Sequence, residues 1–102
     1  MDRFQELREA ILPVVQPYGV RQIAVFGSIV RGEDTPQSDV DILVEFEEPP
    51  QKPLGFFARV RLERELSQQL GRKVDLVSAR GLNRHIRPYV DAEKVVLYEK
   101  TE

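Results

Sequence analysis

Apolar residues recur along the first part of the chain with a helical period and then with a strand period. Residues 2–16 place apolar side chains three and four positions apart, which predicts an amphipathic helix. Pro13 lies within this pattern, so we expect the helix to kink or to end early there. The Pro-Tyr-Gly run at 17–19 ends it in any case.

Four later segments have the apolar pattern of β-strands. Segment 20–26 is apolar on both faces, as expected for a strand covered on both sides. Segment 39–46 alternates most clearly, with Val40, Ile42, Val44 and Phe46 on one face and Asp39, Asp41, Leu43 and Glu45 on the other. The two remaining strands are expected at 73–77 and at 95–98, the last one at a sheet edge.

Two further helices and a loop are expected between these strands. Ser28 can cap a short helix directly after the first strand. Residues 47–55 contain three prolines and are expected to form a loop. A long helix is expected at 56–70, closed by Gly71, with apolar positions at Phe57, Val60, Leu62, Leu66 and Leu70.

After the third strand, Ser78 is expected to begin a short irregular helix that Pro88 interrupts. Taken together, the elements predict an α/β (α+β) domain with a mixed sheet of three or four strands and helices packed against it. At 102 residues, we expect one domain over 1–102.

Composition narrows the function classes. The chain has no cysteine and one histidine, which excludes disulfides and makes a structural zinc site an unfavoured hypothesis. The net charge of −2 argues against direct nucleic-acid binding, which rests on clustered positive charge. No apolar stretch approaches the ~20 residues that span a membrane, and no signal peptide is apparent. We therefore expect a cytoplasmic protein.

The candidate chemistry gathers in one stretch of the first half. Gly27 and Ser28 follow the first strand, where a strand-to-helix turn offers backbone N–H groups and a hydroxyl. Asp39 and Asp41 lie two positions apart at the start of the second strand and so share a face. Two carboxylates ~4 Å apart repel by roughly 4 kcal/mol at an effective dielectric of 20. A divalent cation such as Mg²⁺ would relieve that repulsion, whereas the alternative is a pair of acids solvated at a strand start.

A third acid, Asp75, stands between Val74 and Leu76 in the third expected strand. By itself it would be read as a charge that protects an edge strand from aggregation. Together with the Gly-Ser step and the acid pair, it favours a metal site of three carboxylates beside a phosphate-binding turn.

The pattern of Gly27-Ser28, ten residues and then Asp39-Val40-Asp41 resembles the nucleotidyltransferase superfamily related to DNA polymerase beta. The sequence Gly-Ser-x-x-Arg-Gly, followed by Ser-Asp-Val-Asp-Ile-Leu-Val-Glu-Phe, is similar to the minimal nucleotidyltransferases. These are the antitoxin halves of toxin–antitoxin modules that pair with an all-helical HEPN toxin. Asp75 falls where that family places its third acid, and the resemblance covers nearly the whole chain.

The resemblance implies a reaction and a role for each matching residue. Asp39 and Asp41 would hold two Mg²⁺ ions that bridge the phosphates of ATP, the substrate. Asp75 would complete the shell of one metal and help to activate the acceptor hydroxyl. Gly27 and Ser28 would bind the terminal phosphates, while AMP passes to a hydroxyl, expected to be a tyrosine, of the HEPN toxin.

One departure from the family pattern tempers this reading. Many relatives carry arginine directly after Gly-Ser, where this chain has Ile29, so one phosphate contact is missing. Arg31 remains as a candidate nucleotide contact. It can equally form a structural ion pair with Asp34 or Glu33, and the sequence leaves both readings open.

Two other functions compete with adenylyl transfer to a toxin. The chain could be a non-catalytic antitoxin that blocks its toxin by direct contact, a reading that Ile29 favours and the three acids disfavour. Transfer to a small molecule, as in aminoglycoside nucleotidyltransferases, normally needs a larger acceptor-binding domain. An apolar edge at 95–98 also leaves homodimer formation open.

Overall fold

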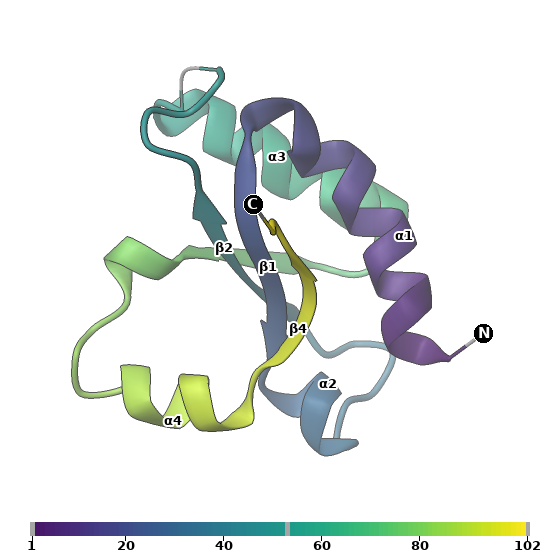
Figure 1. Ribbon diagram of the computed structural model, residues 1–102. Coiled ribbons are helices and arrows are strands. Elements are labelled where there is room, and N and C mark those ends of the chain that lie inside the picture. Colours follow the sequence, from purple (N-terminus) through teal and green to yellow (C-terminus); the bar gives the residue numbers. More distant parts are fainter. Residues whose placement is uncertain (1, 53, 102) are drawn as a thin grey trace.

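The computed structural model describes residues 2–52 and 54–101 and contains a four-stranded mixed sheet in the order β3-β2-β1-β4 (Figure 1). Antiparallel pairing joins β1 to β2 and to β4, whereas β2 and β3 are parallel. This confirms the expected mixed α/β sheet. The strands are β1 (Val20–Phe26), β2 (Val40–Phe46), β3 (Val74–Ser78) and β4 (Val95–Glu99), each within one residue of its expected bounds.

The first helix continues through the proline in its sequence. α1 spans Arg3–Val15 with Pro13 inside it, and the 3-10 helix η1 (Gln16–Tyr18) follows directly. The expectation that the helix ends early at Pro13 is therefore wrong, because the missing N–H falls near the end of a helix held by the burial of Leu7, Ile11 and Val15. Gly19, with a φ of 80°, ends η1 as expected.

The remaining helices include one that the sequence pattern missed. α2 (Ser28–Arg31) and α3 (Phe56–Leu70) lie where expected, and Gly71 closes α3 in the left-handed conformation. The 3-10 helix η2 (Ala79–Gly81) is followed by a regular helix, α4 (Arg87–Glu93). Pro88 does not interrupt a helix but lies in the first turn of α4, where no N–H is needed.

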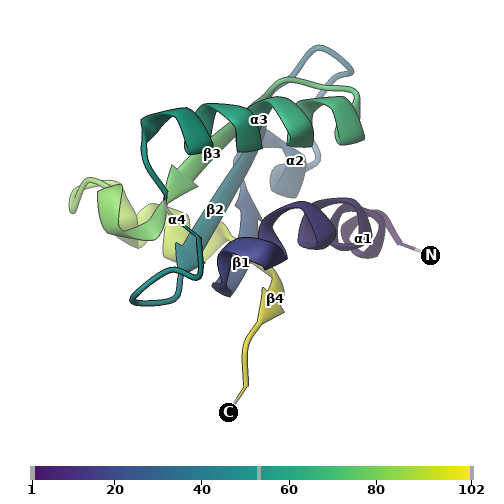
Figure 2. The ribbon, with the colours of Figure 1, turned by 90° about the horizontal axis from the view of Figure 1, so that it is seen from above.

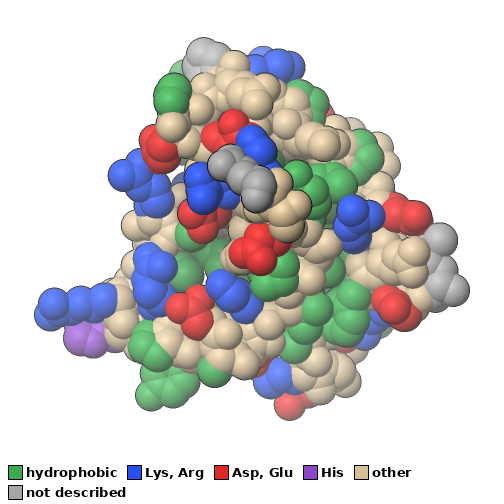
Figure 3. All heavy atoms as spheres, viewed as in Figure 1, with side chains coloured by type: hydrophobic (Ala, Val, Ile, Leu, Met, Phe, Trp, Pro, Cys, Tyr) green, Lys and Arg blue, Asp and Glu red, His purple; other side chains and the backbone are tan. Residues whose placement is uncertain are grey.

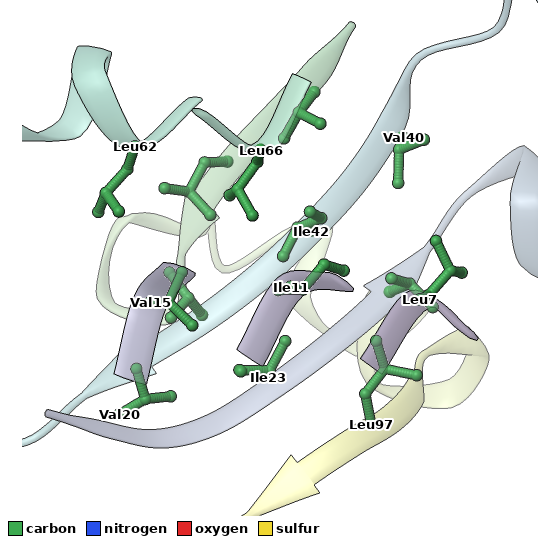
Figure 4. Close-up of a cluster of buried hydrophobic side chains, with 14 of the residues drawn as sticks. Leu7, Ile11, Val15, Val20, Ile23, Val40, Ile42, Leu62, Leu66 and Leu97 are labelled. Atoms are coloured by element: carbon green, nitrogen blue, oxygen red, sulfur yellow. The ribbon is translucent and has the colours of Figure 1, made fainter. Parts of the chain in front are cut away.

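The main core lies between one face of the sheet and the helices α1 and α3 (Figure 2). In Figure 4, Ile11 and Val15 of α1 and Leu62 and Leu66 of α3 point toward the strand residues beneath them. Leu66 is fully buried, and removing such a side chain typically costs 2–5 kcal/mol. The strand residues in this core are Val20, Ile23, Val25, Val40, Ile42, Val44, Val74, Leu76 and Leu97.

Not all of the apolar positions along α3 are buried. Phe57 is 78% exposed and Val60 is 37% exposed. The buried line runs instead through Ala58, Leu62 and Leu66, which are separated by four residues and share one helix face.

The opposite face of the sheet is covered by α4. Val90 of α4 is buried in a small second cluster with Ala24 and Leu43. The predicted alternation of β2 is thus confirmed, with Leu43 facing α4 while Val40 and Ile42 face α1 and α3. Asp41 shares the face of Leu43 and lies on the α4 side.

Side chains of α3 complete the outer edge of β3. The Val74 N–H donates to Ser67 Oγ at 3.1 Å, and the Leu76 N–H donates to Glu63 Oε2 at 2.9 Å. Arg59 donates to the carbonyl of Leu76. These bonds hold β3 in register with β2 and occupy groups that an open sheet edge would expose. Over the described ranges, no helix combines the length and apolarity that crossing a bilayer requires.

Candidate active site

A glycine at the end of β1 lets the backbone pass close to a carboxylate. Gly27 has a φ of 82°, a conformation that residues with side chains rarely adopt. A Cβ added to Gly27 would lie well under 3.0 Å from Oδ2 of Asp41. Position 27 therefore requires glycine on two counts, one conformational and one steric.

The sheet register brings two of the three predicted acids side by side. Asp41 pairs with Asp75 across the parallel β2–β3 ladder and with Phe26 across β1. Asp39 is exposed and precedes β2 by one residue. The turn at Gly27 and the acids Asp39, Asp41 and Asp75 thus lie at one end of the sheet, over three adjacent strands.

The surroundings of Asp41 favour a neighbouring positive charge. Burial raises the pKa of the Asp41 carboxyl, and the charges of Asp75 and Asp39 raise it further. Carboxylates are hard oxygen donors of the kind that Mg²⁺ prefers, so the donor set fits a divalent cation. In the part of the chain that the structure describes, no three acidic or histidine side chains are already gathered around one metal position.

The two residues after Gly27 have different surroundings: Ser28 begins α2 at the candidate site, and Ile29 is buried in the core. Ser28 is the first residue of α2, and Gly27 takes the N-cap position that was expected for Ser28. Ile29 is buried in the core with α1 and α3 and does not face the acids. The departure at position 29 is thus a packing residue in this chain.

Arg31 is held by two carboxylates. Its Nε donates to Glu33 Oε1 at 2.8 Å, and its Nη1 pairs with Glu93 Oε1 at 2.6 Å. These bonds raise the pKa of the guanidinium further above its usual range. Of the two ion-pair partners that the sequence left open, Arg31 therefore pairs with Glu33, whereas Asp34 binds Arg3 and Arg72 instead.

Sequence reasoning missed Glu93, which reaches the site from the end of α4. Its Oε2 accepts the Gly27 N–H at 2.8 Å. Hydrogen bonds from Arg31 and from Gly27 hold the pKa of Glu93 below its usual range. Sixty-six residues separate Glu93 from Gly27, so no local pattern could have indicated the contact.

On the face that carries β4 and α4, acidic and basic side chains are interspersed rather than separated into patches of one sign (Figure 3). This fits a site in which carboxylates are partly balanced by neighbouring arginines.

Comparisons with known proteins agree with this geometry. A family model described as the nucleotidyltransferase domain matches residues 7–101. The chain is 45% identical over 91 residues to the protein adenylyltransferase MntA of Thermococcus cleftensis, covering 89% of this chain and 81% of that protein.

Solved structures are similar over most of the fold. A minimal nucleotidyltransferase structure superposes with a TM-score of 0.71 at 40% identity, covering 86% of each chain. A chain from the crystal structure of a toxin–antitoxin with AMP-PNP superposes with a TM-score of 0.76 at 25% identity, covering 91% of this chain and 73% of that one.

Proposed function

The chain belongs to the nucleotidyltransferase domain family, and from this premise we propose that it transfers AMP from ATP to a hydroxyl group of a partner protein. The similarity to a protein adenylyltransferase supports the reaction, and the similarity to a toxin–antitoxin bound to AMP-PNP supports both the nucleotide and the partner. The partner we propose is a HEPN toxin, which the modification would neutralise.

The proposed reaction is a displacement at the α-phosphorus of ATP. The acceptor oxygen, which is expected to belong to a tyrosine, forms a bond to the α-phosphorus and loses its proton. The bond between that phosphorus and the oxygen bridging to the β-phosphate breaks, and pyrophosphate leaves. Asp75 is the group we assign to help activate the acceptor hydroxyl.

Mg²⁺ is the ion that the carboxylates would hold, with Asp39 and Asp41 as shared ligands and Asp75 as the third. When bound, two such ions neutralise phosphate charge and stabilise the entering and leaving oxygens. Gly27 and Ser28 are assigned to the terminal phosphates, because the turn that they form joins β1 to α2 directly beside the carboxylate of Asp41. Arg31 is a further candidate for phosphate contact.

One observation carries this proposal above all others: Asp41 pairs with Asp75 in the sheet register while its carboxylate lies against the backbone of Gly27. This arrangement supports the proposal, because it brings the carboxylate of Asp41 beside both Asp75 and the turn at Gly27. Neither a solvated strand start nor an edge-strand charge would require that closeness.

Incubation with labelled ATP, Mg²⁺ and the toxin encoded beside this chain tests the proposal. We expect label on the toxin, and we expect the double substitution Asp39→Asn plus Asp41→Asn to abolish its transfer. Asp91→Asn is the matched control, because Asp91 is an exposed acid whose partner is Lys94. If the double variant labels the toxin as well as the wild type does, the catalytic proposal is wrong.

The main rival is an antitoxin that acts by contact alone. Ile29 favours this reading, since its buried apolar side chain offers the phosphates no contact. The same double variant separates the two functions. Undiminished neutralisation of the toxin by a variant that transfers no label would assign the antitoxin effect to binding.

A further inference from the structure

Glu93 connects the last helix of the chain to the turn of the candidate site. Its Oε2 accepts the Gly27 N–H at 2.8 Å, and its Oε1 pairs with Arg31 Nη1 at 2.6 Å. Because each oxygen has its own partner, one carboxylate bridges the residue before α2 and the last residue of α2. Charge-assisted bonds of this kind are about twice as strong as neutral ones.

The position of Glu93 is itself fixed by the packing of α4. Val90, three residues earlier, is buried against Ala24 and Leu43 on the site face of the sheet. Beyond Glu93, the Lys94 N–H donates to the Val90 carbonyl at 2.8 Å, and β4 begins at Val95. The side chain of Glu93 is 26% exposed and that of Arg31 is 48% exposed. The packing of α4 therefore fixes the backbone of Glu93, while the ion pair between Glu93 and Arg31 remains accessible to solvent.

We propose that Glu93 is a positioning residue for nucleotide binding, which holds the Gly27 turn and Arg31 in the orientation that the ATP phosphates require. This inference rests on the proposed function, since it assigns a purpose to the same site. Gly27 lies against Asp41, so the direction of its peptide groups sets the spacing between the phosphate-binding turn and the acids. A turn fixed before ATP arrives avoids an ordering cost on binding.

The sharpest test compares Glu93→Ala with the isosteric Glu93→Gln by steady-state kinetics. Glu93→Ala loses both bonds, and we expect the KM for ATP to rise about tenfold or more with a smaller change in kcat. Glu93→Gln retains an oxygen for the Gly27 N–H but loses the charge that holds Arg31. We expect its KM to lie between those of the wild type and Glu93→Ala.

Glu99→Ala is the matched control, because Glu99 also accepts a side-chain hydrogen bond, from Gln22, but lies on β4. Its KM for ATP should equal that of the wild type. An unchanged KM in a folded Glu93→Ala variant would overturn the inference. A lowered KM would overturn it too, because Glu93 would then compete with the phosphates for the same donors.

Hydrogen exchange at the Gly27 amide separates this inference from the proposed function. If the wild type transfers no AMP, the proposed function fails. The exchange rate still tests whether the hydrogen bond to Glu93 holds the Gly27 amide. We expect Gly27 exchange at least tenfold faster in Glu93→Ala than in the wild type or in Glu99→Ala. Equal rates in all three proteins would show that Glu93 does not hold the turn.

Discussion

At the scale of single residues, the site depends on a glycine whose missing side chain makes room for a carboxylate. Gly27 combines a φ of 82° with the approach of Asp41 Oδ2. Gly71 has a similar φ of 67° but nothing within 4 Å of an added Cβ. The backbone differs as well, because Gly71 has a ψ of 22° and is left-handed helical, whereas Gly27 has a ψ of −152°.

We expect Gly27→Ala to abolish most AMP transfer and to lower the free energy of unfolding by more than Gly71→Ala does. Gly71→Ala costs roughly 1–2 kcal/mol for a left-handed conformation, whereas Gly27→Ala must enter a backbone region that almost only glycine adopts and also displaces Asp41. Urea unfolding and the labelling assay measure the two effects. Equal destabilisation by both substitutions, with full activity of Gly27→Ala, would contradict this account.

The residues of the site differ in how far the sequence could reveal them. Gly27, Asp39 and Asp41 could be proposed as site residues because their spacing along the chain is itself a motif, and Asp75 because it falls where the family places its third acid. Glu93 has no such spacing, since its contact depends on how α4 packs across the sheet. Interactions between distant segments require the tertiary structure before they can be assigned.

At the scale of elements, α3 covers the core with one face and completes the edge of β3 with polar side chains. Glu63 accepts the Leu76 N–H, one residue beyond Asp75. Ser67 accepts the Val74 N–H, one residue before it. The helix thus holds the backbone on both sides of the third acid, which links the stability of α3 to the geometry of the site.

Loss of the Glu63 carboxylate should weaken this edge. We expect Glu63→Ala to lower the free energy of unfolding by about 1–2 kcal/mol, because the Leu76 N–H loses its charged acceptor. Glu65→Ala is the control, since Glu65 is exposed on the same helix and should change stability by less than about 0.5 kcal/mol. Chemical denaturation of the three proteins gives the comparison, and equal midpoints would refute the role of Glu63.

The same scale explains which elements sequence patterns could predict. The bounds of β1 and β2 were predicted well, because β1 is apolar on both faces and the residues of β2 alternate clearly between an apolar and a more polar face. α4 was missed because Pro88 was read as an interruption, although a proline in the first turn is compatible with a helix. The buried face of α3 could not be read from the sequence, because several apolar positions, including Phe57 and Val60, allow more than one helical stripe.

At the scale of the whole molecule, two aspartates contribute to stability with opposite dependence on pH. Asp34 is nearly buried and joins Arg3 of α1 to Arg72 before β3. The bonds from Arg72 and Arg3 hold the pKa of Asp34 below its ordinary value of 3.8. Burial and the nearby acids instead raise the pKa of Asp41 above that value.

The signs of the two substitutions follow from linkage. The stabilising contribution of Asp34 is present above its ordinary pKa and is lost as pH falls through the lowered pKa of the folded state, so Asp34→Asn should lower Tm at neutral pH and matter less in acid. Asp41 is destabilising when ionised, and Asp41→Asn should raise Tm at neutral pH, with the gain vanishing below about pH 4. Thermal unfolding from pH 7 to about pH 3 checks both, and shifts of the same sign would contradict them.

The parallel pairing of β2 with β3 has a consequence for the order in which the site is assembled. β1 and β2 are neighbours in sequence and in the sheet, so their pairing brings Gly27, Asp39 and Asp41 together at a low entropic cost. Asp75 follows Asp41 by thirty-four residues and arrives only when the α3 crossover closes. β3 is also an edge strand, and opening it alone would remove the third acid while leaving the pair in place. We therefore expect Asp39 and Asp41 to be positioned first, by the local pairing of β1 with β2. Asp75 joins them later, through the slower pairing of β2 with β3.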